Sequence, residues 1–126
     1  MDLGIANKLA LVTASGRGLG RSIAINLAEE GAKVAVVSRT EADIDALVEE
    51  MGGLSKGHYG AVADLTEEGV PKKLVKELFS RFGEPSIVVH NLGGALDLTD
   101  PFCSVEDWRK VWRTNVEVAI ELNLLL

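Results

Sequence analysis

The chain has 126 residues, a length that fits one domain with its own hydrophobic core. Its composition, 47% hydrophobic and 25% charged, is that of a folded globular protein and argues against disorder. The formal net charge of −6 argues against a general nucleic-acid or anionic-membrane surface, although it leaves room for a local basic site.

The cysteine content and the N-terminal residues indicate where in the cell the protein is expected. Cys103 is the only cysteine, so no intrachain disulfide can form, and we expect no metal site. The first residues show no basic segment followed by a long apolar core, and no window reaches the roughly 18 apolar residues that a membrane span needs. We therefore expect a cytoplasmic protein without membrane or nucleic-acid partners.

The first predicted element is a buried strand over residues 9–12, LALV, a short apolar run that ends at a glycine turn. Gly16, Gly18 and Gly20 stand at alternate positions in this turn, and their cost in backbone entropy indicates that glycine is required there. From Leu19 onward the apolar residues recur at helical spacing, and Gly31 is placed to end that helix.

Three more pairs of a strand and a helix follow. The second helix is expected to start behind Thr40 as its N-cap. The last helix is expected to start behind Ser104, with Asp107 three residues later as in a capping box. The predicted strands are 34–37, 59–63 and 87–89, and the predicted helices lie around 44–51, 74–82 and 104–116.

This alternation predicts the fold class, an α/β protein with a doubly wound parallel sheet (Rossmann fold) covered by helices on both faces. Right-handed crossovers favour that arrangement over others. We expect a single domain over residues 1–126, with the strand 87–89 beside the strand 9–12 and the sheet truncated after about four βα units.

A strand that leads through glycines into a helix is suited to bind phosphate. Free backbone N–H groups and the positive end of the helix dipole meet there, and an anion can approach where no Cβ blocks it. The turn matches neither G-x-G-x-x-G nor the P-loop, because the glycine after Gly18 is Gly20 and no Gly-Lys-Ser/Thr follows. On the turn alone, a purely structural tight turn therefore remains an alternative.

Four motifs in order along the chain resemble the short-chain dehydrogenase/reductase family. TASGRGLG, residues 13–20, is similar to the family's T-G-x-x-x-G-x-G turn, with alanine in place of the first glycine. VADL, residues 62–65, provides the aspartate that the family uses beside the adenine ring. HNLGG, residues 90–94, is similar to the family's N-N-A-G segment, and RTNVE, residues 113–117, supplies an asparagine in the position of the family's catalytic one.

The resemblance implies a dinucleotide site and a small carbonyl or alcohol substrate. It assigns Asn115 to the catalytic residues, whereas His90 and Leu92 depart from the family's segment. The cofactor-binding residues that it implies are Thr13, Ser15, Gly16, Arg17, Gly18, Leu19, Gly20, Ser38, Arg39, Asp64, Leu65, Asn91, Leu92 and Gly93.

The end of the second strand favours NADP(H) over NAD(H). An acidic residue there binds the ribose 2′-hydroxyl in the general dinucleotide scheme, whereas a nearby arginine accepts a 2′-phosphate. Here Ser38 and Arg39 occupy this place, and no carboxylate occurs between Ser38 and Glu41. Arg17 in the glycine turn is placed to help Arg39 bind the phosphate. The alternative is that both arginines are ordinary solvated surface residues.

The catalytic serine, tyrosine and lysine of the family are not found in this chain. The family needs Y-x-x-x-K, but the only tyrosine, Tyr59, is followed four residues later by Ala63, so we interpret Tyr59 as structural. Neither His58 nor His90 has a recognisable catalytic partner, and a neutral packed histidine is the commoner outcome.

The chain ends at ELNLLL, before the family's fifth strand, and we expect it to be the N-terminal half of a longer enzyme. In that case the strand 87–89 keeps an unpaired apolar edge, and Leu122, Leu124, Leu125 and Leu126 are partly uncovered. The favoured function is an NADP(H)-dependent oxidoreductase of this family, and the alternative is a non-catalytic NADP(H)-binding or interaction module. Trp108 and Trp112 are spaced for a core, but the corresponding helix forms a dimer face in the family, which favours a homo-oligomer.

Overall fold

Four parallel strands form one sheet in the order β3-β2-β1-β4 in the computed structural model, which describes residues 1–126. The strand predicted at 87–89 lies beside the first strand, as expected, and Leu11 is in register with Ala35 on one side and Val88 on the other. The strands are β1 (Leu9–Val12), β2 (Lys33–Ser38), β3 (Tyr59–Val62) and β4 (Ile87–Val89).

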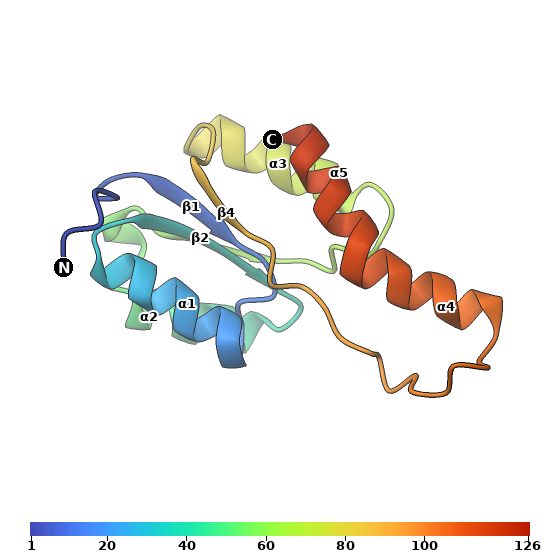
Figure 1. Ribbon diagram of the computed structural model, residues 1–126. Coiled ribbons are helices and arrows are strands. Elements are labelled where there is room, and N and C mark those ends of the chain that lie inside the picture. The colour runs from blue at the N-terminus through green and yellow to red at the C-terminus, as the bar shows by residue number, and fades with distance from the viewer.

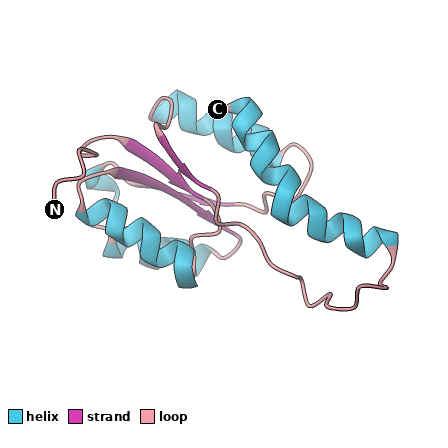
Figure 2. Ribbon diagram, viewed as in Figure 1, coloured by secondary structure: helices cyan, strands magenta, loops and turns pink.

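Helices cover both faces of the sheet, which confirms the predicted doubly wound α/β class (Figure 1 and Figure 2). The helices α1 (Gly18–Glu29) and α2 (Glu41–Glu50) lie on one face, and α3 (Val70–Arg81) and α5 (Val118–Leu125) lie on the other. The helix α4 (Val105–Trp112) continues the line of α5 past the end of the sheet.

Alternation along the two central strands builds a separate core on each face. Successive side chains of a strand point to opposite faces, so an apolar run such as LALV supplies both cores. Leu11 and Val37 pack on the α3 and α5 side, whereas Val12 and Val36 pack on the α1 and α2 side. The side chains of both cores are largely buried. This packing holds the strands in place, and with them the loops that follow their carboxyl ends.

The helices α2 and α4 begin directly after the residues predicted to precede them, whereas α3 begins at Val70, four residues before the predicted range 74–82. The Ser104 hydroxyl accepts a hydrogen bond from the Asp107 amide at 3.1 Å, which confirms the expected cap. Thr40 does precede α2, but its side chain makes no capping hydrogen bond; its own amide donates to the Ser38 hydroxyl at 3.2 Å. A short 3₁₀ helix, Leu54–Lys56, is an element that the sequence did not predict.

The C-terminal helix corrects two expectations. It is interrupted by a π-helical turn, Arg113–Glu117, in which the Val118 amide donates to the Arg113 carbonyl five residues earlier. The prediction that Leu122 is partly uncovered was wrong, because it is fully buried against the core beside α3. Leu124 is exposed as expected, and Leu125 and Leu126 are half-buried.

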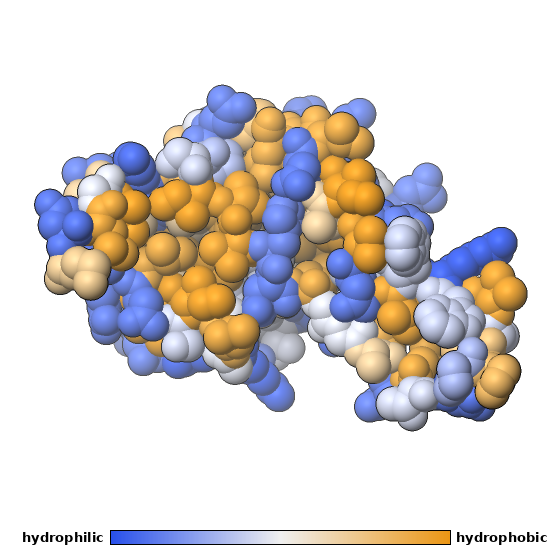
Figure 3. All heavy atoms as spheres, viewed as in Figure 1, coloured by the Kyte–Doolittle hydropathy of each residue, from blue (hydrophilic) through white to orange (hydrophobic).

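The strand β4 pairs with β1 only, and its three residues are half-buried. Apolar side chains gather on the face of the molecule where β4 and α5 lie (Figure 3). On α5 itself, Ile120 and Leu124 are exposed. Trp108 and Trp112 are also about half exposed, so they are not part of the core. No helix has the length and apolar character needed to cross a membrane.

Candidate functional site

A groove of about 810 Å³ lies at the carboxyl ends of the strands. In open parallel sheets this is where ligands bind, at the point where the strand order reverses, here between β1 and β4. The loops after all four strands and the helix α4 line the groove. The lining residues include Ala14, Gly16, Arg17, Ser38, Arg39, Asp64, Leu65, Leu92, Gly93 and Arg109.

The glycine turn leaves backbone donors free at the start of α1. Gly18 has a φ of +59°, a left-handed conformation that glycine adopts without a Cβ penalty. The backbone amide of Arg21 donates to the Arg17 carbonyl at 3.4 Å, so the amides of residues 18–20 precede the first turn of helical hydrogen bonds. They can therefore bind an anion at the positive end of the helix.

Ala14, which stands where the family has glycine, also adopts a left-handed backbone conformation, with a φ of +51°. An alanine there is strained by about 1 kcal/mol. The turn keeps its shape because the Ala14 carbonyl accepts a hydrogen bond from the side-chain amide of Asn91 at 3.0 Å. The loop after β4 thus supports the loop after β1.

Gly20 is required by a close approach of backbone. A Cβ at this position would lie 2.5 Å from the Ala14 carbonyl oxygen and would also collide with the side-chain amide of Asn91. Because the first obstacle is backbone, it cannot move aside as a flexible side chain can. Gly20, Ala14 and Asn91 therefore form one junction between two motifs that are about seventy residues apart in the chain.

Thr13 and Ser15 face the protein interior rather than the groove. The Thr13 hydroxyl accepts hydrogen bonds from the amides of Asn91 at 3.0 Å and Leu92 at 3.1 Å. The Ser15 hydroxyl accepts from the Val37 amide at 3.0 Å. Both side chains are buried, and they join the loop after β1 to the loop after β4 and to the end of strand β2.

We expect Thr13→Val to lower the free energy of unfolding by about 2 kcal/mol, because two amides lose their acceptor while the shape of the side chain is kept. Urea denaturation measures this loss, and Thr13→Ser, which keeps the hydroxyl, is the matched control. Equal stability of the valine variant and the wild type would show that these hydrogen bonds do not hold the loop.

Two arginines lie where β2 ends. Arg39 is exposed, lines the groove and makes no hydrogen bond or ion pair. Arg17 donates through Nε to the Asp43 carboxylate at 2.8 Å, and its terminal nitrogens make no hydrogen bond. The guanidinium groups of both residues therefore keep donors for an anion in the groove.

Asp64 and its neighbours form the wall of the groove after β3. Asp64 Oδ1 accepts hydrogen bonds from the Thr66 amide at 2.9 Å and the Thr66 hydroxyl at 2.6 Å. Burial acts to raise the pKa of Asp64, but these hydrogen bonds and the charge of Arg39 outweigh burial and lower it. The side chain of Asp64 is therefore an ionised carboxylate, which can accept hydrogen bonds. Leu65, the next residue, is buried and lines the groove.

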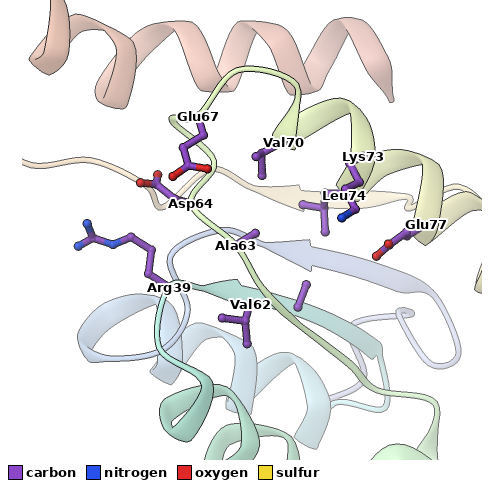
Figure 4. Close-up of a pocket in the computed structure, with 10 residues that line it drawn as sticks. Arg39, Val62, Ala63, Asp64, Glu67, Val70, Lys73, Leu74 and Glu77 are labelled. Atoms are coloured by element: carbon purple, nitrogen blue, oxygen red, sulfur yellow. The ribbon is translucent and has the colours of Figure 1, made fainter.

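A second pocket, of about 480 Å³, lies between β3 and α3 and shares Arg39, Ala63 and Asp64 with the groove (Figure 4). Its floor is apolar, and Lys73 and Glu77 of α3 stand along its side. Arg39 and Asp64 thus lie where the two hollows meet.

Asn115 joins the π-helical turn to the loop after β4. Its Oδ1 accepts from the Gly94 amide at 2.9 Å, and its Nδ2 donates to the Gly94 carbonyl at 2.7 Å and the Val111 carbonyl at 2.9 Å. A Cβ on Gly93 would lie 2.8 Å from Asn115 Oδ1, so this loop packs closely on the asparagine. The structure gives Asn115 a role in holding the groove's far wall.

The groove is positively charged although the chain as a whole is negative. Five cationic side chains and three carboxylates line it, and a cleft with this balance attracts anionic ligands. The cations are Arg17, Arg39, Arg109, Lys110 and Arg113, and the carboxylates are Asp43, Asp64 and Glu106.

Comparison with known proteins identifies the family. The family model described as short chain dehydrogenase matches residues 8–124. The chain belongs to the short-chain dehydrogenase/reductase family. An uncharacterized oxidoreductase of Mycobacterium tuberculosis is 34% identical over 118 residues, which cover 94% of this chain and 45% of the relative.

Other members of the short-chain dehydrogenase/reductase family are also similar to this chain, in sequence or in structure. The 3-oxoacyl-[acyl-carrier-protein] reductase of Staphylococcus epidermidis is 37% identical over 112 residues, which cover 88% of this chain and 46% of the relative. The L-sorbose reductase of Gluconobacter frateurii, solved with NADPH and L-sorbose, has a TM-score of 0.88 at 29% identity, over 100% of this chain and 48% of that one. The chain spans about half the length of these relatives.

Tyr59, His58 and His90, which belong to no catalytic motif, form hydrogen bonds within this short-chain dehydrogenase/reductase. Burial raises the pKa of Tyr59, and a hydrogen bond from its hydroxyl to Glu77 at 3.1 Å raises it further, which is the opposite of what a general base needs. Burial lowers the pKa of His58, which as a neutral ring accepts the Val34 amide at 3.1 Å. His90 pairs with Asn123 at 2.8 Å.

Sequence reasoning missed the contribution of α4 and the π-helical turn to the groove. Three cationic residues of this segment line the groove, although they lie more than forty residues after Asp64 in the chain: Arg109, Lys110 and Arg113. No family motif includes the first two. The basic character of the segment 109–113 was the available signal. Asp43 was also missed, although it lies in the first turn of the helix that follows Thr40.

Proposed function

We propose that the groove binds NADP(H) and that this chain carries the cofactor-binding part of an oxidoreductase. The reaction class is hydride transfer between the nicotinamide and a carbonyl or alcohol carbon, and the bound nicotinamide supplies or accepts that hydride. The proposal rests chiefly on one observation, the unpartnered Arg39 guanidinium at the end of β2, where no carboxylate stands.

The residues of the groove fit a dinucleotide with an extra phosphate. The free amides of residues 18–20 suit the pyrophosphate, because they lie at the positive end of α1. The carboxylate of Asp64 suits the amino group of the base, with Leu65 offering an apolar surface beside it. Arg39, with help from Arg17, suits the 2′-phosphate.

Two further facts support the choice of NADP(H). The excess of cations in the groove favours the dinucleotide with more phosphate charge. In addition, the sorbose reductase that this chain resembles was solved with NADPH and a sugar substrate. A small polar carbonyl or alcohol compound is the substrate class that we propose.

Fluorescence titration with NADPH and NADH tests the proposal. We expect NADPH to bind about tenfold to a hundredfold more tightly, because the 2′-phosphate gains charge-assisted hydrogen bonds worth about 1.5–3 kcal/mol. Equal affinities would contradict the preference, and no binding of either dinucleotide would contradict the proposal as a whole.

We also propose that the protein is a homo-oligomer through the outer face of α4. Trp108 and Trp112 are about half exposed, one helical turn apart, on a helix that extends beyond the sheet. We expect Trp112→Glu to increase the elution volume in size-exclusion chromatography. Glu29→Gln on α1, an exposed position away from α4, is the control. An unchanged elution volume for Trp112→Glu would argue against this interface.

A further inference from the structure

We propose that Arg113 is a positioning residue for the wall of the groove that carries Asp64. This inference rests on the proposed binding of NADP(H), because its consequence is tighter binding of the adenine end of the cofactor. Arg113 lies in the π-helical turn, two residues before Asn115, and is remote in sequence from the loop after β3. No motif assigns it a role.

The Arg113 guanidinium connects two elements that are otherwise separate in the chain. Its Nε donates to the Thr66 carbonyl at 3.1 Å, and Nη2 donates to the Leu65 carbonyl at 3.5 Å. On its other side, Nη1 contacts the Glu121 carboxylate at 2.7 Å and that of Glu117 at 3.8 Å. The side chain is 23% exposed, so these contacts are better protected from water than ordinary surface pairs.

The contacts lead directly to the carboxylate in the groove. The Asp64 side chain is held by the amide and the hydroxyl of Thr66, and the carbonyl of the same threonine is held by Arg113. The position of the Asp64 carboxylate therefore depends on Thr66, and the position of Thr66 depends on the guanidinium.

The π-helical turn consequently fixes two walls of one groove. Arg113 holds the loop after β3, while Asn115 holds the loop after β4 through Gly94. A π turn displaces side chains relative to an ordinary helix, and such turns are frequent at functional sites. The RTNVE segment, in which only the asparagine matched a family motif, thus has a second functional side chain.

The chemistry of the site requires arginine rather than lysine. A guanidinium has several donors in a fixed planar fork, and here it donates to carbonyls on one edge and to a carboxylate on the other. A lysine ammonium is a single point of charge and cannot span the same partners. In Arg113→Lys, the ammonium therefore keeps either the carboxylate or the loop carbonyls.

We test this with Arg113→Lys, measuring NADPH affinity by fluorescence and amide hydrogen exchange of Thr66 and Glu67. The expected result is a loss of NADPH affinity of about tenfold, together with faster exchange confined to this loop. Adenosine 2′,5′-bisphosphate, which carries the adenine end without nicotinamide, is expected to lose affinity by the same factor. Arg21→Lys is the matched control, because Arg21 also pairs with a carboxylate, that of Glu50, but does not line the groove.

The outcomes separate the inference from the proposed function. If the wild type binds NADPH and Arg113→Lys leaves both affinity and exchange unchanged, the inference is overturned and the proposed function stands. If the wild type binds no dinucleotide, the proposed function fails, and the role of Arg113 in cofactor binding fails with it. Should Arg113→Lys not fold, Glu121→Gln keeps the guanidinium but weakens one partner; a smaller loss in the same direction supports the inference, and no change overturns it.

Discussion

Gly20→Ala is expected to reduce NADPH binding below detection and to lower the free energy of unfolding by about 1–3 kcal/mol, the range for overpacking a tight site. The added Cβ meets the Ala14 carbonyl and the Asn91 side chain. The glycine turn and the loop after β4 must then separate, so the free amides at the start of α1 move relative to the rest of the groove. Fluorescence titration and urea denaturation measure the two effects.

A second glycine provides the control for this variant. Gly69, before α3, has a φ of +81°, but no atom lies within 4 Å of the place that a Cβ would take, so Gly69→Ala adds backbone strain without a collision. We expect it to lose some stability and to keep NADPH affinity. A Gly20→Ala variant that binds NADPH as tightly as Gly69→Ala would show that the junction of Gly20 with Asn91 is not needed for binding.

Arg39→Asp is expected to lower NADPH affinity by about a hundredfold and to leave NADH affinity within a few-fold of the wild type. The change removes the unpartnered guanidinium and puts a carboxylate at the end of β2, where it repels a 2′-phosphate and can accept a hydrogen bond from a 2′-hydroxyl. The loss corresponds to about 2.7 kcal/mol, in the range for hydrogen bonds to charged groups.

Lys76→Asp is the matched control, because it makes the same change of net charge at an exposed position of α3 that lines neither pocket. If Lys76→Asp lowers NADPH affinity as much as Arg39→Asp, the effect is one of overall charge. A ratio of NADPH to NADH affinity that Arg39→Asp leaves unchanged would contradict the assignment of Arg39.

The fold could be predicted from the sequence because its signals are local. Short apolar runs such as LALV and VAVV, each ended by a turn, indicate buried parallel strands, and helical stripes between them indicate the crossovers. The cap at Ser104 is also a local pattern, and it is confirmed at the level of its hydrogen bond. These features need no knowledge of distant residues.

The errors concern contacts between segments that are far apart. Leu122 looks like one leucine among several, and only the packing of α5 beside α3 buries it while Leu124 stays exposed. The widened turn at 113–117 has no sequence signature of its own, so a single helix was expected there. Trp108 and Trp112 also have the spacing of core residues, although a dimer face was favoured for them, and they lie half exposed on α4, which extends past the sheet.

Eight of the fourteen predicted cofactor-binding residues line the groove, but the sequence does not show what each side chain contacts. The sequence assigned Thr13 and Ser15 to the cofactor, but their hydroxyls are buried and bonded to neighbouring loops. Arg17 was expected to face a 2′-phosphate, and its Nε is paired with Asp43. Such roles depend on which side chains meet in space, and the motif spacing carries no information about that.

Binding of NADP(H) in the groove formed by the loops after the four strands is the proposal on which the others depend. Amide chemical-shift perturbation on adding NADPH to isotopically labelled protein tests it most directly. We expect the largest changes at residues 16–20, at Arg39, at residues 64–66 and at residues 92–94, which line or border the groove. Changes confined to the α3 side of the second pocket, or no changes at all, would contradict it.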